Sequence, residues 1–277
     1  MTTNNNQEIL ARLREVKEKT PELAEVIDLQ HDLLEAQVQA RIPPAHLMHS
    51  AEEAKTRFSR GISLLRPLEI ELDWEAFSNL YRQVCHIASR HRPDLTTQLE
   101  EILTLLEDDP DSVQTLVMSY IEDGNLATMN EEFEAQGELQ TFVFNHALHP
   151  FLRAYADALF PLVEQKSWQR GRCPICGGEP DLAFLDVESG SRHLICSRCE
   201  SQWLYPRIKC PFCDTSDSTK LSYYPFEDGK YRLYVCRDCR RYLKAVDLRK
   251  AGHRVLFPVE RITTVAMDVA AQEEGFQ

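Results

Sequence analysis

The residues of this chain best suited to chemistry are its cysteines. Eight of the nine lie between positions 173 and 239, and all eight form Cys-x-x-Cys pairs. The pairs are Cys173 and Cys176, Cys196 and Cys199, Cys210 and Cys213, and Cys236 and Cys239. Each such turn directs two sulfur atoms to one point, and two turns complete the tetrahedral thiolate shell that suits zinc or iron. The pairs also suit redox-active dithiols, an alternative that the sequence leaves open.

The spacing of the pairs predicts two similar modules. Nineteen residues separate Cys176 from Cys196, and 22 separate Cys213 from Cys236, so each gap suits a β-hairpin between two metal-binding turns. We expect strands at 181–187 and 192–195, and again at 221–224 and 231–235. The first two pairs recur 37 and 40 residues later, which indicates an internal duplication and favours sequential pairing of the turns.

A bound ion would be essential to the stability of modules this small. A ribbon of about 35 residues buries too little apolar surface to fold alone, whereas a structural zinc ion contributes roughly 10–16 kcal/mol of binding free energy. Four sulfur ligands leave no open position for activated water, so we expect no hydrolysis and predict that the chain is not an enzyme. Iron in the same shell could transfer one electron.

Charge is distributed unevenly along the 277 residues. Residues 1–169 hold 14 Lys and Arg against 29 Asp and Glu, a balance of −15, whereas residues 170–277 hold 17 against 15, a balance of +2. An acidic first half argues against general nucleic-acid binding. The start of the sequence lacks the features of a secretory signal, and no run of about 20 apolar residues follows. We therefore expect a cytoplasmic protein without membrane insertion.

The first half of the sequence predicts a bundle of about six helices. Apolar residues recur at helical spacing after Thr20-Pro21, from about Asp73, and within 95–107, 112–121 and 138–164, where Pro150 and Pro161 suggest a break or kink. A short last helix would be capped by Thr263 or Thr264 and docked by residues including Val269 and Phe276.

These features together predict an α+β multidomain protein. An N-terminal all-α helical bundle precedes two tandem rubredoxin-like or zinc-ribbon modules of four cysteines each, and a short helix ends the chain. The predicted limits are 1–168 for the helical domain, 169–208 and 209–260 for the two metal modules, and 261–277 for the C-terminal helix.

The cysteine-rich half also resembles a known family. The run Cys196-Ser-Arg-Cys199-Glu200-Ser-Gln-Trp203-Leu-Tyr-Pro-Arg207-Ile-Lys209-Cys210-Pro-Phe-Cys213, together with Cys236-Arg-Asp-Cys239-Arg-Arg-Tyr242-Leu243-Lys244, is similar to the formate dehydrogenase accessory proteins of the FdhE family. The resemblance implies a cytoplasmic assembly factor that binds the catalytic subunit of formate dehydrogenase. It also implies a helical domain followed by two rubredoxin-like modules, with iron as a candidate metal beside zinc.

Several residues outside the predicted metal shells fall on motif positions of that family. They are Glu200, Trp203, Arg207, Lys209, Tyr242 and Lys244. The resemblance makes the last five candidates for partner binding, and tryptophan is common at the centre of protein interfaces. Two alternatives remain open: Trp203 packs over its own module, and Arg207 and Lys209 only stabilise nearby thiolates.

Two other functions compete with the accessory role. The first is a rubredoxin-like electron carrier or a thiol redox protein. The second is a zinc-ribbon protein that binds nucleic acid through the basic stretch at 237–254. The acidic first half opposes the second, because it would repel phosphate.

Overall fold

The structure is a computed structural model and describes residues 3–45, 50–66, 69–123, 134–252 and 254–277. The chain divides into two units. The first contains Met1–Met48 and Leu65–Leu159, and the second contains His49–Leu64 and Phe160–Gln277. Residues 50–64 therefore belong to the same unit as the cysteine-rich part of the chain, although the sequence placed them in the helical domain. The limits predicted within the second unit, at 208 and 260, stay predictions.

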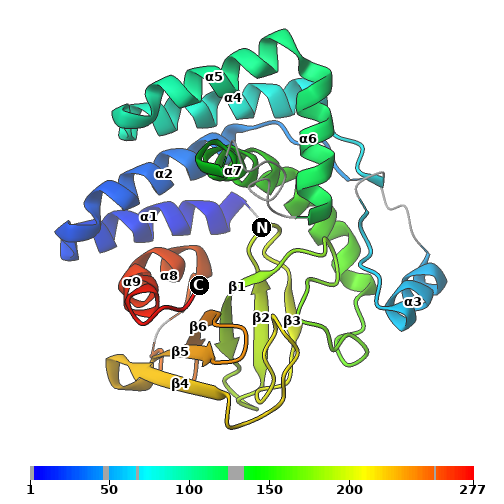
Figure 1. Ribbon diagram of the computed structural model, residues 1–277, viewed down its shortest axis with the longest axis vertical. Coiled ribbons are helices and arrows are strands. Elements are labelled where there is room, and N and C mark those ends of the chain that lie inside the picture. Colours follow the sequence, from blue (N-terminus) through cyan, green and yellow to red (C-terminus); the bar gives the residue numbers. More distant parts are fainter. Residues whose placement is uncertain (1–2, 46–49, 67–68, 124–133, 253) are drawn as a thin grey trace. The chain divides into compact units, whose positions relative to one another are not determined.

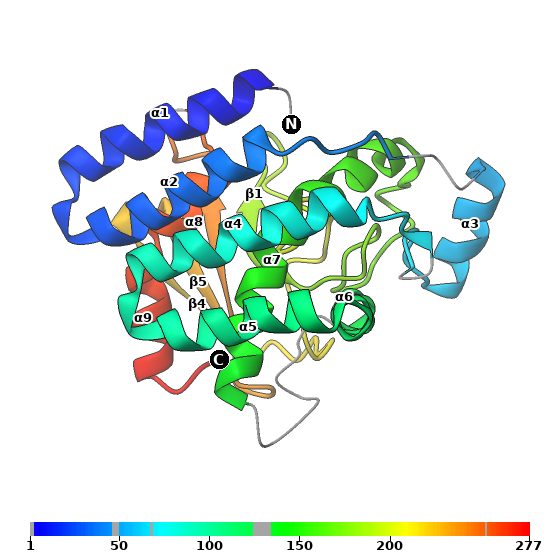
Figure 2. The same ribbon diagram turned by 90° about the horizontal axis from the view of Figure 1, so that it is seen from above.

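The first unit is helical, as the apolar spacing predicted. Its described helices are α1 (Thr3–Lys19), α2 (Ala24–Gln39), α4 (Trp74–His91), α5 (Thr96–Asp108), α6 (Pro110–Asp123) and α7 (Glu134–Leu159). Figure 2 shows α1, α2, α4 and α5 side by side in chain order. Aromatic side chains form much of the core, because Phe77, Tyr81, Tyr120 and Phe144 are fully buried and lie in ring contact. None of the described helices is both long enough and apolar enough to cross a membrane.

Two helices begin with an aspartate cap, and the sequence indicated the first of these starts. Asp73 caps α4 by accepting a hydrogen bond from the Ala76 backbone at 2.9 Å, and Asp109 accepts one from the Ser112 backbone at the start of α6. The threonine of the helix start that the sequence indicated at Thr20-Pro21 does not cap a helix. Its hydroxyl instead donates to the Val16 carbonyl at 3.0 Å, at the end of α1, and a short 3-10 turn at Pro21–Leu23 precedes α2.

Helix α7 continues through Pro150, where the sequence suggested a break. Proline has no N–H, so the carbonyl of His146, four residues earlier, loses its usual helical partner. The side-chain amide of Gln37 on α2 donates to that carbonyl at 2.8 Å and replaces the missing bond. The second proline, Pro161, lies beyond the helix in a 3-10 turn at Phe160–Leu162.

Helix α3 (Ala51–Arg60) begins the second unit and was not expected from the sequence. Its start is a capping box: the Ser50 hydroxyl accepts a hydrogen bond from the Glu53 N–H, and the Glu53 carboxylate accepts one from the Ser50 N–H. It ends at Gly61, whose φ of 68° lies in the left-handed region that glycine adopts without strain. Residues 61–64 then lead to the first cysteine pair, because the Leu64 N–H donates to the Pro174 carbonyl at 2.9 Å.

The centre of the second unit is one six-stranded sheet (Figure 1). Its strands are β1 (Pro180–Leu185), β2 (Arg192–Cys196), β3 (Gln202–Leu204), β4 (Leu221–Phe226), β5 (Tyr231–Cys236) and β6 (Tyr242–Asp247), in the order β3-β2-β1-β6-β5-β4. Each predicted module therefore supplies three consecutive strands. The sheet confirms both predicted hairpins, since β1 pairs with β2 and β4 with β5 in antiparallel register.

The two modules meet at the middle of this sheet. Strand β1 pairs in parallel with β6, with Leu182 opposite Lys244 and Leu185 opposite Asp247. This pairing joins residues about 60 positions apart, and no local sequence pattern indicated it. The turn between β4 and β5 is a 3-10 turn in which Glu227, Asp228 and Gly229 all have positive φ.

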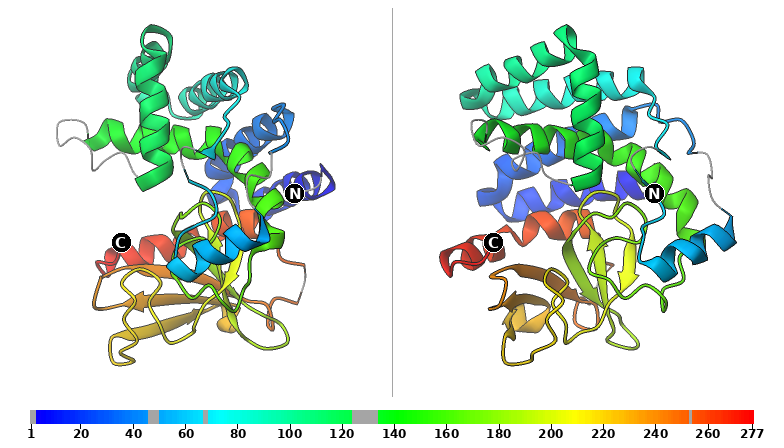
Figure 3. Two further views of the ribbon diagram at one scale, coloured as in Figure 1. Left: turned by 90° about the vertical axis from the view of Figure 1, so that its right-hand side faces the viewer. Right: turned by 45° about the vertical axis from the view of Figure 1, so that its right-hand side comes forward.

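Two short helices, α8 (Phe257–Thr263) and α9 (Val265–Glu273), end the chain and pack against the sheet (Figure 3). Met267, Ala271 and Phe276 share a buried cluster with residues of β5 and β6. The prediction that Val269 docks this segment is wrong, because its side chain is exposed on the outer face of α9. The side chain of Thr264 precedes α9 without capping it and donates instead to the Glu260 carbonyl.

Candidate metal centres

The eight paired cysteines form two separate clusters of sulfur atoms. In the first, Cys173 lies 3.6 Å from Cys199, and Cys176 lies 3.4 Å from both Cys196 and Cys199. In the second, the Cys210–Cys239 and Cys213–Cys236 sulfur distances are both 3.7 Å. All sulfur atoms of a cluster lie within 4.8 Å of one another. The clusters follow the sequential pairing that the duplication predicted.

The four Cys-x-x-Cys turns share one backbone design. The residue directly after the second cysteine has positive φ in every turn, at Gly177, Glu200, Asp214 and Arg240, with values from 57° to 73°. The first cysteine of each turn donates its N–H to a carbonyl five residues later, as Cys173 does to Gly178 and Cys236 does to Arg241. Three of the four left-handed positions carry side chains, where the conformation costs roughly 1–2 kcal/mol each. The closed turn that positions two sulfur atoms offsets this cost.

The dimensions of both clusters fit a tetrahedral ion. Four thiolates at about 2.3 Å from one ion are separated from each other by about 3.8 Å. The observed separations of 3.4–3.7 Å are close to that value. Backbone N–H groups also support the sulfur atoms, since Ile175 donates to Cys173 and Arg198 donates to Cys196, each at 3.4 Å. Four sulfur donors are typical of structural zinc and of rubredoxin-type iron.

Burial disfavours the thiolate form at Cys173 and Cys210. Burial raises the pKa of Cys173 well above its usual range, and burial likewise raises the pKa of Cys210. Burial alone would also raise the pKa of Cys236, but the backbone N–H groups of Cys239 and Asp238 lower it. A divalent cation would supply the positive charge that favours all four thiolates of a cluster.

Charged side chains connect the first cluster to the rest of its unit. Arg261 of α8 bonds Asp181 through Nε at 2.7 Å, Glu200 through Nη1 at 2.9 Å and the Cys196 carbonyl through Nη2 at 3.3 Å. Burial alone would lower the pKa of Arg261, but the two carboxylates raise it, so the side chain stays a cation. Arg261 thus links the C-terminal helices directly to a metal-binding turn.

Comparisons with known proteins agree with this architecture. A family model described as FdhE, central domain, matches residues 172–207, which contain the whole first cluster. The FdhE homolog of Aquifex aeolicus (strain VF5) is 29% identical over 274 residues, which cover 96% of this chain and 90% of that relative. The chain is thus similar to an FdhE homolog along nearly its whole length. A shorter match, to the FdhE homolog of Haemophilus ducreyi, is 30% identical over 164 residues and covers 57% of this chain and 53% of the relative.

A solved FdhE structure has the same fold. The crystal structure of the FdhE protein from Pseudomonas aeruginosa matches with a TM-score of 0.68 and 20% identity, and the match covers 100% of this chain and 94% of the other. The order of a helical region, a sheet with two four-cysteine clusters and a short C-terminal helical segment is therefore the FdhE fold, as the sequence predicted.

Three of the FdhE motif positions predicted to bind a partner contribute to the interior of the unit. Trp203 is fully buried and its Nε1 donates to the Arg170 carbonyl at 2.9 Å, which matches the alternative that it packs over its own module. Tyr242 donates its hydroxyl to Asp268 of α9. Lys244 is buried and its Nζ lies 2.6 Å from the same carboxylate. These contacts give all three residues a structural role, while partner binding by them stays a prediction.

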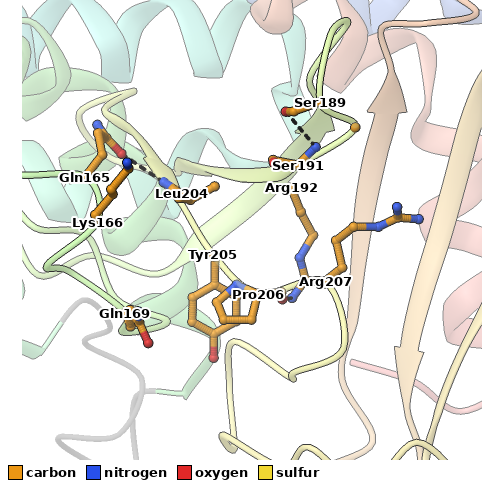
Figure 4. Close-up of a pocket in the computed structure, with 11 residues that line it drawn as sticks. Gln165, Lys166, Gln169, Ser189, Ser191, Arg192, Leu204, Tyr205, Pro206 and Arg207 are labelled. Atoms are coloured by element: carbon orange, nitrogen blue, oxygen red, sulfur yellow. Dashed lines mark hydrogen bonds between the residues drawn. The ribbon is translucent and has the colours of Figure 1, made fainter.

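The two remaining positions differ from each other. The Nζ of Lys209 is 2.8 Å from Asp214, the left-handed residue of the third turn, so it supports that turn. Arg207 is exposed and lacks a hydrogen bond or ion pair to any described residue. It lines a pocket of about 260 Å³ with Lys166, Arg192 and Tyr205 (Figure 4). Of the five candidates, Arg207 is the most accessible to a partner.

Sequence reasoning missed the residues that surround the first cluster. Ser63 donates its hydroxyl to the Cys173 carbonyl at 3.0 Å from a position 110 residues earlier, and Arg261 reaches Cys196 from 65 residues later. Neither lies in a motif, so only the folded chain shows their role.

Proposed function

We propose that this chain is a non-catalytic accessory protein for formate dehydrogenase that binds the catalytic subunit of that enzyme. Two tetrahedral ions, zinc or iron, would hold its cysteine-rich unit in the binding conformation. The observation that carries the proposal is the pair of four-sulfur clusters joined by one sheet in a chain similar to FdhE homologs.

The ligand sets support a role in binding more than a role in catalysis. Four cysteine ligands fill a tetrahedral shell, so neither cluster offers a position at which an ion could activate water or polarise a substrate. The ninth cysteine, Cys85, is buried in α4, and burial raises its pKa to about 12, which makes it a poor nucleophile.

The segment between the two clusters is the best candidate for partner contact. Residues 206–208 connect β3 to the third cysteine turn, and Pro206, Arg207 and Ile208 are all exposed. The Ile208 side chain is 65% exposed, which is unusual for isoleucine, and the cationic Arg207 precedes it. Such a pair suits a partner surface that combines an apolar pocket with a carboxylate.

Affinity purification from the native host tests this proposal. A tagged chain, expressed anaerobically while the host makes formate dehydrogenase, should retain the catalytic subunit. The Arg207→Glu and Ile208→Asp variants should retain at least about tenfold less, which corresponds to about 1.4 kcal/mol. Val187→Asp provides a matched control, because Val187 is also exposed in the same unit.

Two results would contradict the proposal. One is a wild-type chain that never retains the catalytic subunit. The other is a deletion strain in which formate oxidation is unaffected. A loss of binding in Val187→Asp equal to that in Ile208→Asp would show that residues 206–208 are not the contact.

An electron carrier is the second candidate, because a ligand of the second cluster, Cys213, is exposed and would let an electron reach a bound iron ion. Red protein with a reversible one-electron step would support it, and colourless protein with two zinc ions would exclude it. The nucleic-acid alternative is less favoured. Arg241 pairs with Glu179, Lys244 with Asp268 and Arg249 with Asp247, so part of the basic stretch at 237–254 is already neutralised.

A further inference from the structure

The two cysteine clusters have the same geometry but differ in their access to solvent. In the first cluster all four cysteines are buried, with no more than 5% of any residue exposed. In the second, Cys210 and Cys236 are buried, whereas Cys213 is exposed and Cys239 is partly exposed. The duplicated turns therefore produced one enclosed site and one open site.

Contacts from outside the first module and one from within it enclose the first site. Residues 61–64, after α3, cover the first turn, where the Ser63 hydroxyl bonds the Cys173 carbonyl and the Leu64 N–H bonds the Pro174 carbonyl. On the opposite turn, Arg261 bonds the Cys196 carbonyl, and the Ser201 hydroxyl lies 3.2 Å from the Cys199 sulfur. These contacts come from three separate parts of the chain and surround the buried ligands.

The second site also has supporting contacts, but they leave Cys213 exposed. The Tyr205 hydroxyl bonds the Cys210 carbonyl at 2.9 Å, and the Arg241 side chain lies over the Phe212 ring. Neither contact involves the side chain of Cys213. Cys213, the second cysteine of its turn, faces solvent, whereas Cys176 at the equivalent position of the first module is buried.

Access of this kind controls ligand exchange. Replacing one ligand of a filled tetrahedral shell requires an incoming donor to approach the ion while the outgoing sulfur leaves, and enclosure blocks both movements. Contacts that hold the ligands from outside the shell typically change metal affinity by 10–100-fold. An exposed cysteine without such contacts is therefore the point at which exchange begins.

We propose that the second site exchanges its metal ion with thiolate donors through Cys213, whereas the first site retains its ion as a fixed part of the fold. The inference rests on the proposed occupancy of both sites. In the exchange a bond between the metal ion and the incoming sulfur would form as the bond between the ion and the Cys213 sulfur breaks. The released Cys213 thiolate would take up the proton that the incoming thiol gave up. No electrons are transferred, so no oxidant or reductant is required.

Zinc release to a chromogenic chelator tests this proposal on the full chain. Protein loaded with zinc and mixed with excess 4-(2-pyridylazo)resorcinol should release its ions in two phases of equal amplitude. The slow phase should be about 10- to 100-fold slower than the fast phase. The Cys213→Ser variant should lose the fast phase and keep the slow one.

A second variant and a second measurement keep the test independent of folding defects. Ser63→Ala removes one contact that encloses the first site, and it should accelerate only the slow phase. Brief treatment of wild-type zinc protein with iodoacetamide, followed by peptide mass spectrometry, should modify Cys213 before any cysteine of the first site.

Each contrary result has a definite meaning. Release of both ions at one rate, loss of the slow phase in Cys213→Ser, or earlier alkylation of Cys173 or Cys176 would overturn the inference and leave the accessory role intact. Protein that binds no zinc or iron at all would overturn the inference together with the proposed metal sites. Retention of both ions without retention of formate dehydrogenase would refute only the proposed function.

Discussion

Replacing Arg261 with methionine should destabilise the second unit. The guanidinium makes two bonds to Asp181, one to Glu200 and one to the Cys196 carbonyl. Only 21% of the Arg261 side chain is exposed. Methionine keeps the apolar stem but leaves two carboxylates close together without a cation.

The size of the effect follows from the exposure of these partners. Removing one member of a buried ion pair costs about 3–5 kcal/mol. The Glu200 side chain is only 9% exposed, but that of Asp181 is 38% exposed, so water can solvate part of the charge that remains. We therefore expect the free energy of unfolding to fall by about 3 kcal/mol, at the lower end of that range.

Urea unfolding at fixed zinc concentration, followed by tryptophan fluorescence, measures this change. Trp168 and Trp203 are buried within the second unit and report on its unfolding. Lys220→Met serves as a matched control, because Lys220 is exposed and its side chain forms no hydrogen bond or ion pair with the described residues. This substitution should change the free energy of unfolding by less than about 0.5 kcal/mol. A loss below about 1 kcal/mol for Arg261→Met would refute the argument, since it would mean that water already screens the pairs.

Three further predictions concern the helical unit. Burial and the nearby His149 lower the pKa of His146 from its usual 6.5 to about 4. The stability that depends on neutral His146 is therefore complete above pH 6.5 and is lost as the pH falls from 6.5 towards 4. Because His146 is only half-buried, we expect a reduced effect. Between pH 7 and pH 4.5 in urea titrations, the free energy of unfolding of the wild type should fall by about 1 kcal/mol more than that of His146→Gln. Equal decreases would contradict this. Gln37→Leu should cost about 1–3 kcal/mol by leaving the carbonyl opposite Pro150 without a donor, and an unchanged urea midpoint would show that water replaces the amide. Cys85 should resist a chromogenic disulfide reagent in native protein at pH 8 and react only after unfolding; rapid native reaction would disprove its burial.

The sequence predicted the features that depend on neighbouring residues. The Cys-x-x-Cys turns and both hairpins are formed by contacts within about 25 residues, so their spacing was sufficient to place them. The cap at Asp73 and the helical spacing of the first half are equally local.

Features that depend on distant residues could not be predicted in this way. The parallel pairing of β1 with β6 joins the two modules, yet each strand alone suits either an edge or a centre of a sheet. Helix α7 passes through Pro150 only because Gln37 lies opposite the freed carbonyl. The same reasoning applies to Trp203: the family motif identified the residue, but only the fold shows that it is buried.

Native mass spectrometry of anaerobically purified protein, combined with chelator treatment, tests the central claim most directly. The clusters predict two ions per chain, and removal of both should unfold the cysteine-rich unit while the far-ultraviolet signal of the helical unit persists. Protein that carries no ions and unfolds at the same urea concentration before and after chelation would contradict the account.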